Sequence, residues 1–313
     1  MKSLHESVLL KEAIDGLNIV PGDIVVDATV GGAGHFSAIL DKLDGNGALI
    51  GIDADASAIE RGEAAAQHAR AAVHLVEDNF RNLSSILDTL NIRQVSKVLF
   101  DLGWSAYHLE SGRGFSFRAE EPLLMTYGTP VHGQTAADMI NSASEEALAD
   151  LFFTLGEERF ARQIAKGIVK ERAHNRILTT GDLVKVILAS TPAWYQHRRL
   201  HPATKTFQAL RIAVNDELGA LRQGLSSAIE RLTPGGRIAV ITFHSIEDRI
   251  VKTMLRDAAH AGVGTLVTKK PIAPSLTETR ENPRARSAKL RIFERGGAES
   301  ESLSALSSYA YAS

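Results

Sequence analysis

Acidic residues that end short apolar runs are the first features of this chain that suggest chemistry. Asp27 ends the run that precedes the turn "VGGAGH", residues 30–35. Three of the four residues 31–34 in this turn are glycine, and the fourth is Ala33. Glycine lets a backbone approach a ligand closely, and the start of the following helix offers free N–H groups to a nucleotide. Residues 24–35 therefore predict a nucleotide-binding turn.

The spacing of the glycines bears on which nucleotide this turn binds. Gly32 and Gly34 fit the first two positions of the dinucleotide fingerprint G-x-G-x-x-G, but Ser37 takes the third, which weakens the nicotinamide interpretation. Asp27 would repel a pyrophosphate, whereas it could receive the ammonium group of a methionine-derived cofactor. Ordering of the turn is an equally open role for Asp27.

Two later segments supply groups that suit a nucleoside. Asp53 ends the next apolar run, about 20 residues after the turn, where a carboxylate can accept both ribose hydroxyls. Asp78 and Asn79 could reach an adenine edge, and Phe80 could lie on the adenine face. Plain core packing is the alternative for Phe80.

Asp101 ends the run "VSKVLFD" and would point into the same crevice. In a methyltransferase, the acceptor atom meets the methyl group here. The exocyclic amine of a pyrimidine is a poor nucleophile, because its lone pair is delocalised into the ring. A carboxylate that accepts its N–H bonds restores electron density, and in-line positioning supplies the rest. Asp101 is therefore the predicted catalytic residue, and no metal is required.

The elements that must position these acids alternate in type over the first third of the chain. Strands that alternate with helices predict a parallel sheet with helices on both faces. Right-handed crossovers make this a doubly wound, mostly parallel, Rossmann-like α/β sheet with ligands at the carboxyl ends of its strands. The predicted strands span residues 23–29, 47–55, 72–80 and 95–103.

The alternation stops near residue 109 and returns late. Residues 109–200 carry loop and helix patterns only, which predicts an inserted helical domain. One long helix is then expected over 203–232, followed by the turn "TPGG" and a strand over 237–245. We expect the sheet domain to comprise residues 1–108 and 201–295, and residues 296–313 to be a disordered tail.

Composition limits the partners and the compartment. The 313 residues carry a formal net charge of −2, so a nucleic acid must be met by local basic patches. Cysteine is absent, which excludes disulfides and thiolate metal sites. No apolar run reaches the roughly 20 residues of a membrane span. We expect a soluble, cytoplasmic protein without a membrane partner.

Several longer strings resemble one known family. Together with the glycine turn and "DLG", they are similar to the bacterial 16S ribosomal RNA cytosine-N4 methyltransferases of the RsmH/MraW type, from about His5 to Glu294. The strings are "GRGFSF" (112–117), "GEERFARQIAKGIV" (156–169), "HPATKTFQALRIAVNDEL" (201–218), "FHSIEDRIVK" (243–252) and "NPRARSAKLRI" (282–292).

The resemblance implies a reaction and a set of cofactor contacts. Family members use S-adenosylmethionine to methylate the N4 of a cytosine in the decoding region of 16S ribosomal RNA in the small ribosomal subunit, and carry a helical domain after the fourth strand. The implied cofactor-binding residues are Ala33, Gly34, His35, Asp53, Phe80, Asp101 and His108.

Three positions depart from the family pattern. Ala33 stands where the family commonly has glycine, and costs about 1 kcal/mol if the backbone there needs a positive φ. His108 replaces the usual glutamine. The family's "LDMRM" is "LLMTY" at residues 123–127, which lacks an acid and an arginine.

The substrate-handling candidates come from the resemblance and from chemistry. An aromatic residue is needed to stack on a flipped-out base, and Phe115 lies just after the fourth strand, although Phe117 could instead fill the core of the insertion. The candidates are Arg113, Phe115, His201, Arg211, Asn215 and His244.

Some patterns leave alternatives. His244, Glu247 and Asp248 could suggest a metal site, but a capping box between Ser245 and Asp248 is favoured. The basic residues of 159–172 are either a solvated face or an RNA-facing stripe. The basic run 282–292 is expected to form a late strand with its basic residues exposed.

Two rival functions and one assembly stay open. The first rival is an amine methyltransferase that acts on DNA or a small molecule, and the second is an RNA-binding relative without activity. The block 201–218 argues against the first rival. The helical insertion could also supply a homodimer contact.

Overall fold

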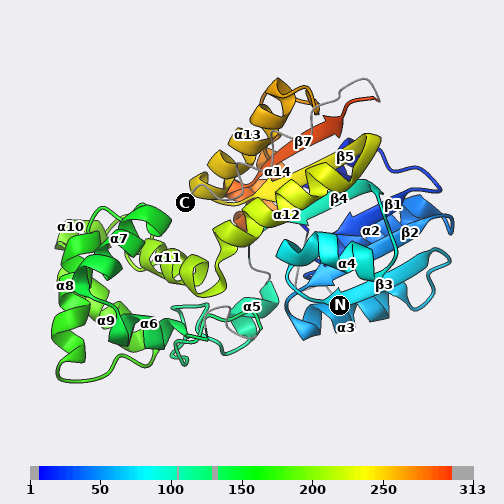
Figure 1. Cartoon of the computed structure of the whole chain (residues 1–313). Coiled ribbons are helices and arrows are strands. Elements are labelled where there is room, and N and C mark those ends of the chain that lie inside the picture. Colours follow the sequence, from blue (N-terminus) through cyan, green and yellow to red (C-terminus); the bar gives the residue numbers. More distant parts are fainter. Residues whose placement is uncertain (1–6, 104–105, 129–132, 298–313) are drawn as a thin grey trace. The chain divides into compact units, whose positions relative to one another are not determined.

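The chain folds into two compact units, which we describe separately from a computed structural model (Figure 1). The structure describes residues 7–103, 106–128 and 133–297, so the predicted tail lies outside the described residues from residue 298 on. The sheet unit comprises Met1–Ser105 and Leu218–Ser313, and the helical unit comprises Ala106–Glu217. Among the described residues, no helix is long and apolar enough to cross a membrane.

A seven-stranded sheet, in the order β3-β2-β1-β4-β5-β7-β6, forms the centre of the sheet unit. Strands β1 to β5 pair in parallel, whereas β7 is antiparallel to both β5 and β6. The predicted doubly wound, mostly parallel fold is confirmed. The strands are β1 Ile24–Asp27, β2 Ala48–Asp53, β3 Ala72–Glu77, β4 Val95–Asp101, β5 Leu232–Thr242, β6 Gly264–Leu266 and β7 Lys289–Arg295.

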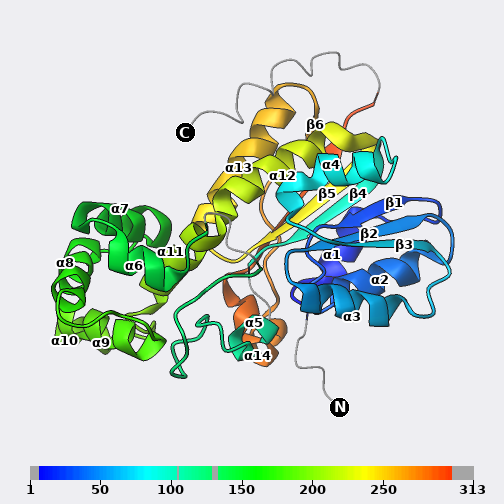
Figure 2. The same ribbon diagram turned by 60° about the horizontal axis from the view of Figure 1, so that its bottom comes forward.

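Helices cover both faces of this sheet. Strand side chains alternate between the faces, so Val26 and Phe100 join one apolar core while Val25 and Leu99 join the other. Figure 2 shows α4, α12 and α13 on the first face and α1, α2 and α3 on the second. The helices are α1 Leu10–Leu17, α2 Gly34–Leu43, α3 Ala56–Ala66, α4 Leu83–Thr89, α12 Glu217–Arg231, α13 Ser245–His260 and α14 Leu276–Glu281, with 3-10 turns at Phe80–Asn82 and Pro283–Ser287.

The helical unit has an apolar core of its own. Phe152, Ile164, Leu183 and Phe207 are buried in it and come from four different helices. Among the described residues of this unit, the only β pairing is an isolated bridge between Pro122 and Thr179. The helices are α5 Ala106–Glu110, α6 Ala136–Ser142, α7 Glu145–Gly156, α8 Ala161–Arg172, α9 Thr180–Ser190, α10 Ala193–Gln196 and α11 Thr204–Asn215.

The single long helix expected over 203–232 is wrong. Asp216 adopts a left-handed backbone, with φ 46° and ψ 47°, and separates α11 from α12. Helix α11 packs tightly on α7, because a Cβ added to Gly156 would lie 2.5 Å from the carbonyl oxygen of Lys205. The helical unit therefore runs from Ala106 to Glu217, whereas the sequence placed its limits at 109 and 200.

The "TPGG" segment is not a turn before the last parallel strand, as expected from sequence. It lies inside β5, which already begins at Leu232 and pairs there with Val95. The register against β4 then shifts between Val95 and Lys97, and Gly235 takes a φ of 73° in this irregular part. The bulged segment allows the regular pairing to resume at Arg237.

Candidate functional site

The glycine turn connects β1 to α2 through a left-handed backbone. Ala33 is the N-cap of α2 with φ 61° and ψ 16°, so the condition under which alanine is costly at this position is met. Gly31 is also left-handed, with φ 50°. The Ala33 N–H donates to the carbonyl of Val30 at 2.7 Å, which closes the turn. Helix α2 then presents its N-terminus beside the end of β1.

Gly34 lies close to a neighbour within the protein. It opens α2, and a Cβ added to it would lie 2.0 Å from the Oγ of Ser7. A side chain at this position would therefore force the Ser7 side chain to move. The sequence argument assigned the close approach at this turn to a ligand, but at Gly34 the structure assigns it to Ser7.

Asp53 is fixed at the carboxyl end of β2 by two backbone donors. Gly31 N–H donates to its Oδ2 and Asp55 N–H donates to its Oδ1, both at 2.9 Å. The first bond ties the end of β2 to the glycine turn after β1. These two bonds orient the carboxylate at the strand end, which is the position that a ribose-binding acid takes in nucleotide-binding sheets.

Three ionisable residues, of which Asp27 and His35 are buried and Asp101 is partly buried, meet at the ends of β1 and β4 and the start of α2. We call Asp27, His35 and Asp101 the acid–histidine cluster. His35 Nδ1 lies 3.3 Å from Asp101 Oδ2, and Asp27 Oδ1 accepts from the N–H of Thr29 at 3.1 Å. The Oγ1 of Thr29 in turn accepts from the N–H of Asp101 at 2.7 Å. Thr29 thus joins the two strand ends.

The cluster leaves polar atoms that no described residue satisfies. Asp27 Oδ2, Asp101 Oδ1 and His35 Nε2 are buried and have no hydrogen-bond partner in the described part of the chain. A buried polar group without a partner costs about 1–3 kcal/mol. The two carboxylate oxygens would accept bonds from a ligand that brings donors, such as an ammonium or hydroxyl groups.

The environment changes the pKa of two members of the cluster. Burial raises the pKa of Asp27 to about 7, and the charges of Asp101 and Asp53 act in the same direction. Burial lowers the pKa of His35, but the hydrogen bond and charge of Asp101, together with Asp27, more than offset this, so its pKa lies above the ordinary value. Both shifts therefore favour the protonated forms of these two side chains over those of the free residues.

Phe80 takes part in the core of the sheet unit. Its ring meets Phe100 edge-on, with centroids 5.5 Å apart at 82°. A Cβ added to Gly224 of α12 would lie 2.7 Å from the Phe80 ring, so the ring is in close contact with this helix. The residue is only half-buried, so core packing leaves part of its surface open.

Asp78 and Asn79 shape the short turn that carries Phe80. Asp78 Oδ1 accepts from the N–H of Asn79 and from Asn82 Nδ2, and Asn79 Oδ1 accepts from the N–H of Arg81. Their side chains therefore hold the 3-10 turn after β3. This local role is one that the sequence analysis did not weigh.

His108 lies in the helical unit, whereas the other six predicted cofactor residues belong to the sheet unit. Within its own unit, the buried imidazole contacts Phe115 and Tyr127, with ring centroids 5.4 and 4.8 Å away. Phe115 and Tyr127 stack nearly parallel at 11°. The Arg113 guanidinium lies 5.7 Å from the Phe115 centroid and donates to the carbonyl of Thr126. The two substrate candidates Arg113 and Phe115 therefore lie together within the helical unit.

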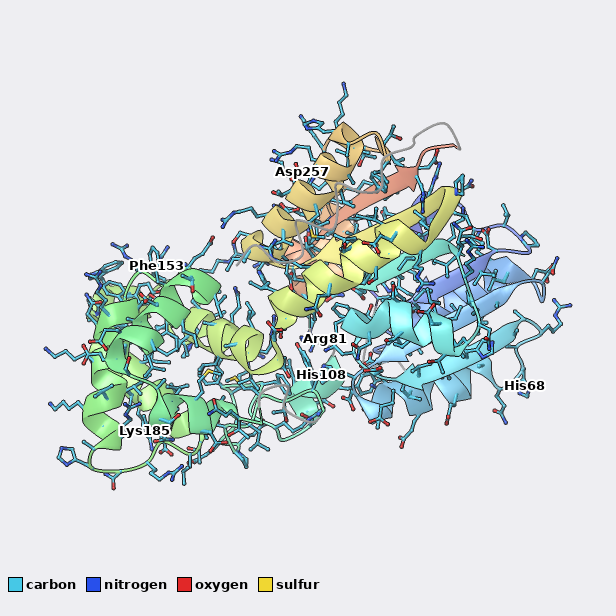
Figure 3. The ribbon with its side chains drawn as sticks, in the orientation of Figure 1. His68, Arg81, His108, Phe153, Lys185 and Asp257 are labelled. Atoms are coloured by element: carbon cyan, nitrogen blue, oxygen red, sulfur yellow. The ribbon has the colours of Figure 1, made fainter. Side chains whose placement is uncertain are left out.

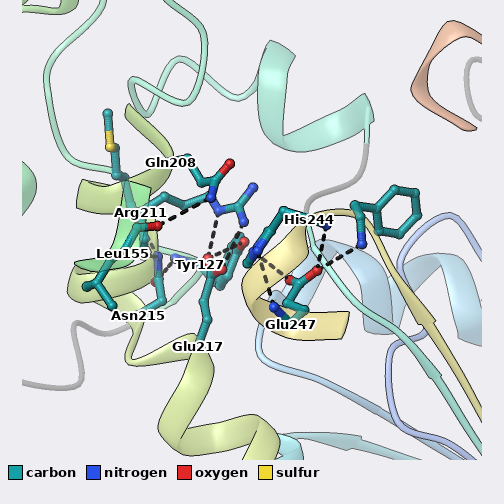
Figure 4. A network of polar contacts seen from close by, with 10 residues as sticks. Tyr127, Leu155, Gln208, Arg211, Asn215, Glu217, His244 and Glu247 are labelled. Atoms are coloured by element: carbon teal, nitrogen blue, oxygen red, sulfur yellow. Dashed lines mark hydrogen bonds and ion pairs between the residues drawn. The ribbon is translucent and has the colours of Figure 1, made fainter. Parts of the chain in front are cut away.

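Arg211 and Asn215 belong to a buried polar network of the helical unit (Figure 4). Arg211 forms two bonds with the Glu217 carboxylate, at 2.8 and 2.9 Å, and Tyr127 Oη donates to Glu217 Oε1 at 2.9 Å. Asn215 Nδ2 donates to the carbonyl of Met125, and its Oδ1 accepts from the N–H of Tyr127. Both candidates therefore hold the 125–127 segment on α11.

Glu217 and Tyr127 are residues that the sequence analysis missed. Arg211 and Glu217 are separated by the left-handed Asp216, so helical periodicity gives no signal for their pairing. Tyr127 is part of the "LLMTY" departure, and it contributes the hydroxyl that completes the network. This departure therefore has a structural role in this chain.

His201 packs against Phe117, with centroids 4.6 Å apart at 17°. Its Nδ1 accepts from the N–H of Ala203, and burial lowers the pKa of the imidazole. Phe117 also meets Phe207 edge-on at 5.3 Å. Phe117 therefore packs against the core of the helical unit, which was the structural alternative considered for it.

The predicted capping box at the start of α13 is displaced by one residue. His244 is the N-cap, and its Nδ1 accepts from the N–H of Glu247. Glu247 Oε2 accepts from the N–H of Phe243 at 2.8 Å and of His244 at 3.3 Å (Figure 4). Ser245 is already inside the helix, so the predicted pair of Ser245 with Asp248 is wrong.

Asp248 instead joins α13 to β7. It accepts bonds from Arg291 Nε at 2.8 Å and from Lys289 Nζ at 2.9 Å, and these two partners lower its pKa against the opposing effect of burial. The late strand is confirmed as β7, but Arg291 is buried, so the expectation that its basic residues are all exposed is wrong.

Comparison with known proteins gives consistent matches. The model of the MraW methylase family matches residues 2–296. The chain is 47% identical over 297 residues to a protein of Dictyoglomus thermophilum named "Ribosomal RNA small subunit methyltransferase H", covering 94% of this chain and 98% of the relative. Relatives with the same name from Brevibacillus brevis and Deinococcus radiodurans are 44% and 45% identical, covering 93% and 94% of this chain and 98% and 90% of the relatives.

Proposed function

Since the chain belongs to the MraW methylase family, we propose that it transfers a methyl group from S-adenosylmethionine to the N4 of a cytosine in the decoding region of 16S ribosomal RNA. The observation that carries the proposal is the acid–histidine cluster beside the glycine turn, with Asp53 at the next strand end. We further propose that the substrate is ribosomal RNA within the small subunit and that the protein works in the cytoplasm, with a homodimer as its assembly.

The unsatisfied atoms of the sheet unit fit this cofactor. Asp53 would accept the ribose hydroxyls, because both of its oxygens are already oriented by backbone donors. The backbone of residues 33–35 would lie against the cofactor at the start of α2. Asp27 Oδ2 is the acceptor available for an ammonium group, while its Oδ1 orders the turn through Thr29. Both roles that the sequence left open for Asp27 are thus compatible.

S-adenosylmethionine supplies a methyl carbon made electrophilic by a sulfonium. Asp101 would do the work on the acceptor side. Its Oδ1 is free to accept a hydrogen bond from the cytosine amine, which directs the nitrogen lone pair and receives the proton that the amine loses. Its Oδ2 is held by His35, so the carboxylate is oriented before the substrate arrives.

The test uses small ribosomal subunits from a strain that lacks the modification, with labelled S-adenosylmethionine. We expect one N4-methylcytidine near the decoding site, and a loss of at least about 100-fold in transfer for Asp101→Ala, the scale of a lost acid–base group. Asp101→Asn is the matched control for shape. An active Asp101→Ala enzyme would remove Asp101 from the mechanism.

Asp53→Ala separates cofactor binding from chemistry. We expect a higher KM for S-adenosylmethionine with much of kcat retained at saturation, since the ribose lies away from the reacting atoms. Unchanged cofactor affinity would contradict the ribose role. Transfer to DNA but not to ribosomal RNA would support the first rival function, and cofactor binding with no transfer would support the second.

A further inference from the structure

The helical unit carries an aromatic and cationic surface that the proposed reaction does not use. Its five residues come from the start of α8 and from α10 with the residues after it, and we call them the arginine–tryptophan platform. They are Arg159, Phe160, Trp194, Tyr195 and Arg198.

The platform is held together by ring and cation contacts. The Arg159 guanidinium lies 5.2 Å from the Phe160 centroid and 5.1 Å from the Trp194 ring. The Arg198 guanidinium lies 5.6 Å from the Tyr195 centroid. The three aromatic rings meet edge-on, with centroids 4.8 to 5.9 Å apart. Such cation–π contacts orient the arginines without consuming their N–H donors.

A buried acid anchors this surface to the unit. Glu158 is fully buried, and its Oε2 accepts from Tyr195 Oη at 2.7 Å. The Oε1 of Glu158 accepts from the N–H of Phe160. These two bonds join α10 to the start of α8, so the rings keep a fixed arrangement. Trp194 nevertheless remains 52% exposed, which is unusual for so large an apolar side chain.

The charge around the platform is net positive, because the cations Arg159, Arg198, Arg199 and Lys205 outnumber the acids Glu157 and Glu158. Within the described residues, neither Arg159 nor Arg198 forms an ion pair with a carboxylate. The segment "QHRRLH", residues 196–201, contains two arginines and two histidines and no acid. The Lys205 ammonium lies beside the same segment, where it donates to the carbonyl of Glu157. An exposed aromatic face among unpaired guanidinium groups is complementary to an unpaired base and its phosphates.

We propose that the arginine–tryptophan platform binds an unpaired nucleotide of ribosomal RNA, with a base on Trp194 and phosphates on Arg159 and Arg198. The inference rests on the proposed function in taking RNA as the partner. Among the basic residues of 159–172, the proposal assigns Arg159 to RNA, whereas Arg172 donates to the carbonyl of Ile140 within the unit.

The test measures binding of radiolabelled 16S ribosomal RNA to the full chain without cofactor. Trp194→Ala removes the ring on which one base stacks, so we expect it to bind the RNA about 5- to 150-fold more weakly. Trp194→Phe keeps an aromatic ring and should keep most of the affinity. Arg159→Gln should reduce the slope of log affinity against log salt by about 0.7. Phe153→Ala is the matched control, because Phe153 is an aromatic residue of α7 that is 65% exposed and has no cation over it in the described structure (Figure 3).

A second readout does not depend on affinity. Trp194 emission, taken as the difference between the parent and Trp194→Phe, should be quenched when RNA is added. Parent-like affinity of Trp194→Ala, or an equal loss with Phe153→Ala, would overturn the proposal. So would a change of sedimentation mass in Trp194→Ala at unchanged RNA affinity, which would assign the face to a second copy of the chain. The two proposals can fail separately. If the platform variants lose RNA binding but the parent protein forms no N4-methylcytidine, the proposed reaction is wrong and the proposed role of the platform in RNA binding is retained.

Discussion

At the residue scale, the site depends on polar groups placed at strand ends. Asp27, Asp53 and Asp101 are predictable from sequence, because each follows an apolar run and parallel strands bring their carboxyl ends to one edge. The partner of Asp101 is less predictable. His35 is a turn residue in the sequence, and only the start of α2 brings its Nδ1 to within 3.3 Å of that carboxylate.

Ala33→Gly is expected to stabilise the protein. A left-handed alanine costs about 1 kcal/mol, and glycine removes this strain at φ 61°. The loss of one buried methyl group and the greater entropy of the unfolded chain reduce the gain, so we expect at most about 1 kcal/mol by urea unfolding. The matched control is Gly31→Ala at φ 50°, where there is space for a Cβ and the backbone alone should cost about as much. Destabilisation by Ala33→Gly would show that the methyl contact outweighs the strain.

Asp27→Asn is expected to stabilise the unliganded protein in a pH-dependent way. The folded pKa of about 7 lies above the unfolded value of 3.8, so the folded state binds the extra proton and the parent loses stability as pH rises from about 4 to 7. The uncharged asparagine avoids this loss. The difference should approach zero near pH 4 and reach on the order of 4 kcal/mol above pH 7, less the lost attraction to His35.

Urea unfolding at pH 5 and pH 8 measures this effect. Asp41→Asn, an exposed substitution on α2, should show no change in its effect between the two pH values. An equal effect of Asp27→Asn at both pH values would mean that Asp27 is not buried as an ionisable group.

At the element scale, the sequence predicts the sheet well and the helix boundaries less well. Residues 203–232 contain no proline and have a continuous helical pattern, yet the helix breaks at Asp216. The break is stabilised by tertiary contacts, since Arg211 on one side pairs with Glu217 on the other. Local propensity carries no information on such a pair. The same holds at α13, where a histidine caps the helix although a serine follows it.

Asp248→Ala should lower the stability of the protein by removing the ion pairs between α13 and β7. It leaves the Arg291 side chain, only 9% exposed, without its carboxylate, and loss of one partner of a buried pair costs about 3–5 kcal/mol. Lys289→Ala is the control, because Lys289 pairs with the same acid but is 42% exposed and should cost no more than about 1 kcal/mol. Thermal unfolding of both variants gives the comparison, and equal losses would contradict the buried role of Arg291.

At the scale of the whole molecule, two units with separate cores imply two unfolding events. Only the sheet unit holds the glycine turn, Asp53 and the acid–histidine cluster, so S-adenosylmethionine should stabilise that unit. We expect calorimetry to resolve two unfolding transitions. Cofactor at 100 times its Kd should raise the free energy of unfolding of the sheet unit by about 2.7 kcal/mol and leave that of the helical unit unchanged. Asp53→Ala at the same cofactor concentration should shift the transition of the sheet unit less. A single transition whose midpoint temperature rises with cofactor would show that the two units unfold together.

The order of the sheet has a consequence for biosynthesis. Strand β7 lies between β5 and β6, although it is the last of the three to be translated. The helical unit is continuous in the chain and is complete before β5 is made. The edge of β5 then stays unpaired until Lys289–Arg295 emerge, which takes about a few seconds at 5–20 residues per second. A nascent chain halted in this interval exposes a strand edge open to aggregation, so the cofactor half of the molecule matures last.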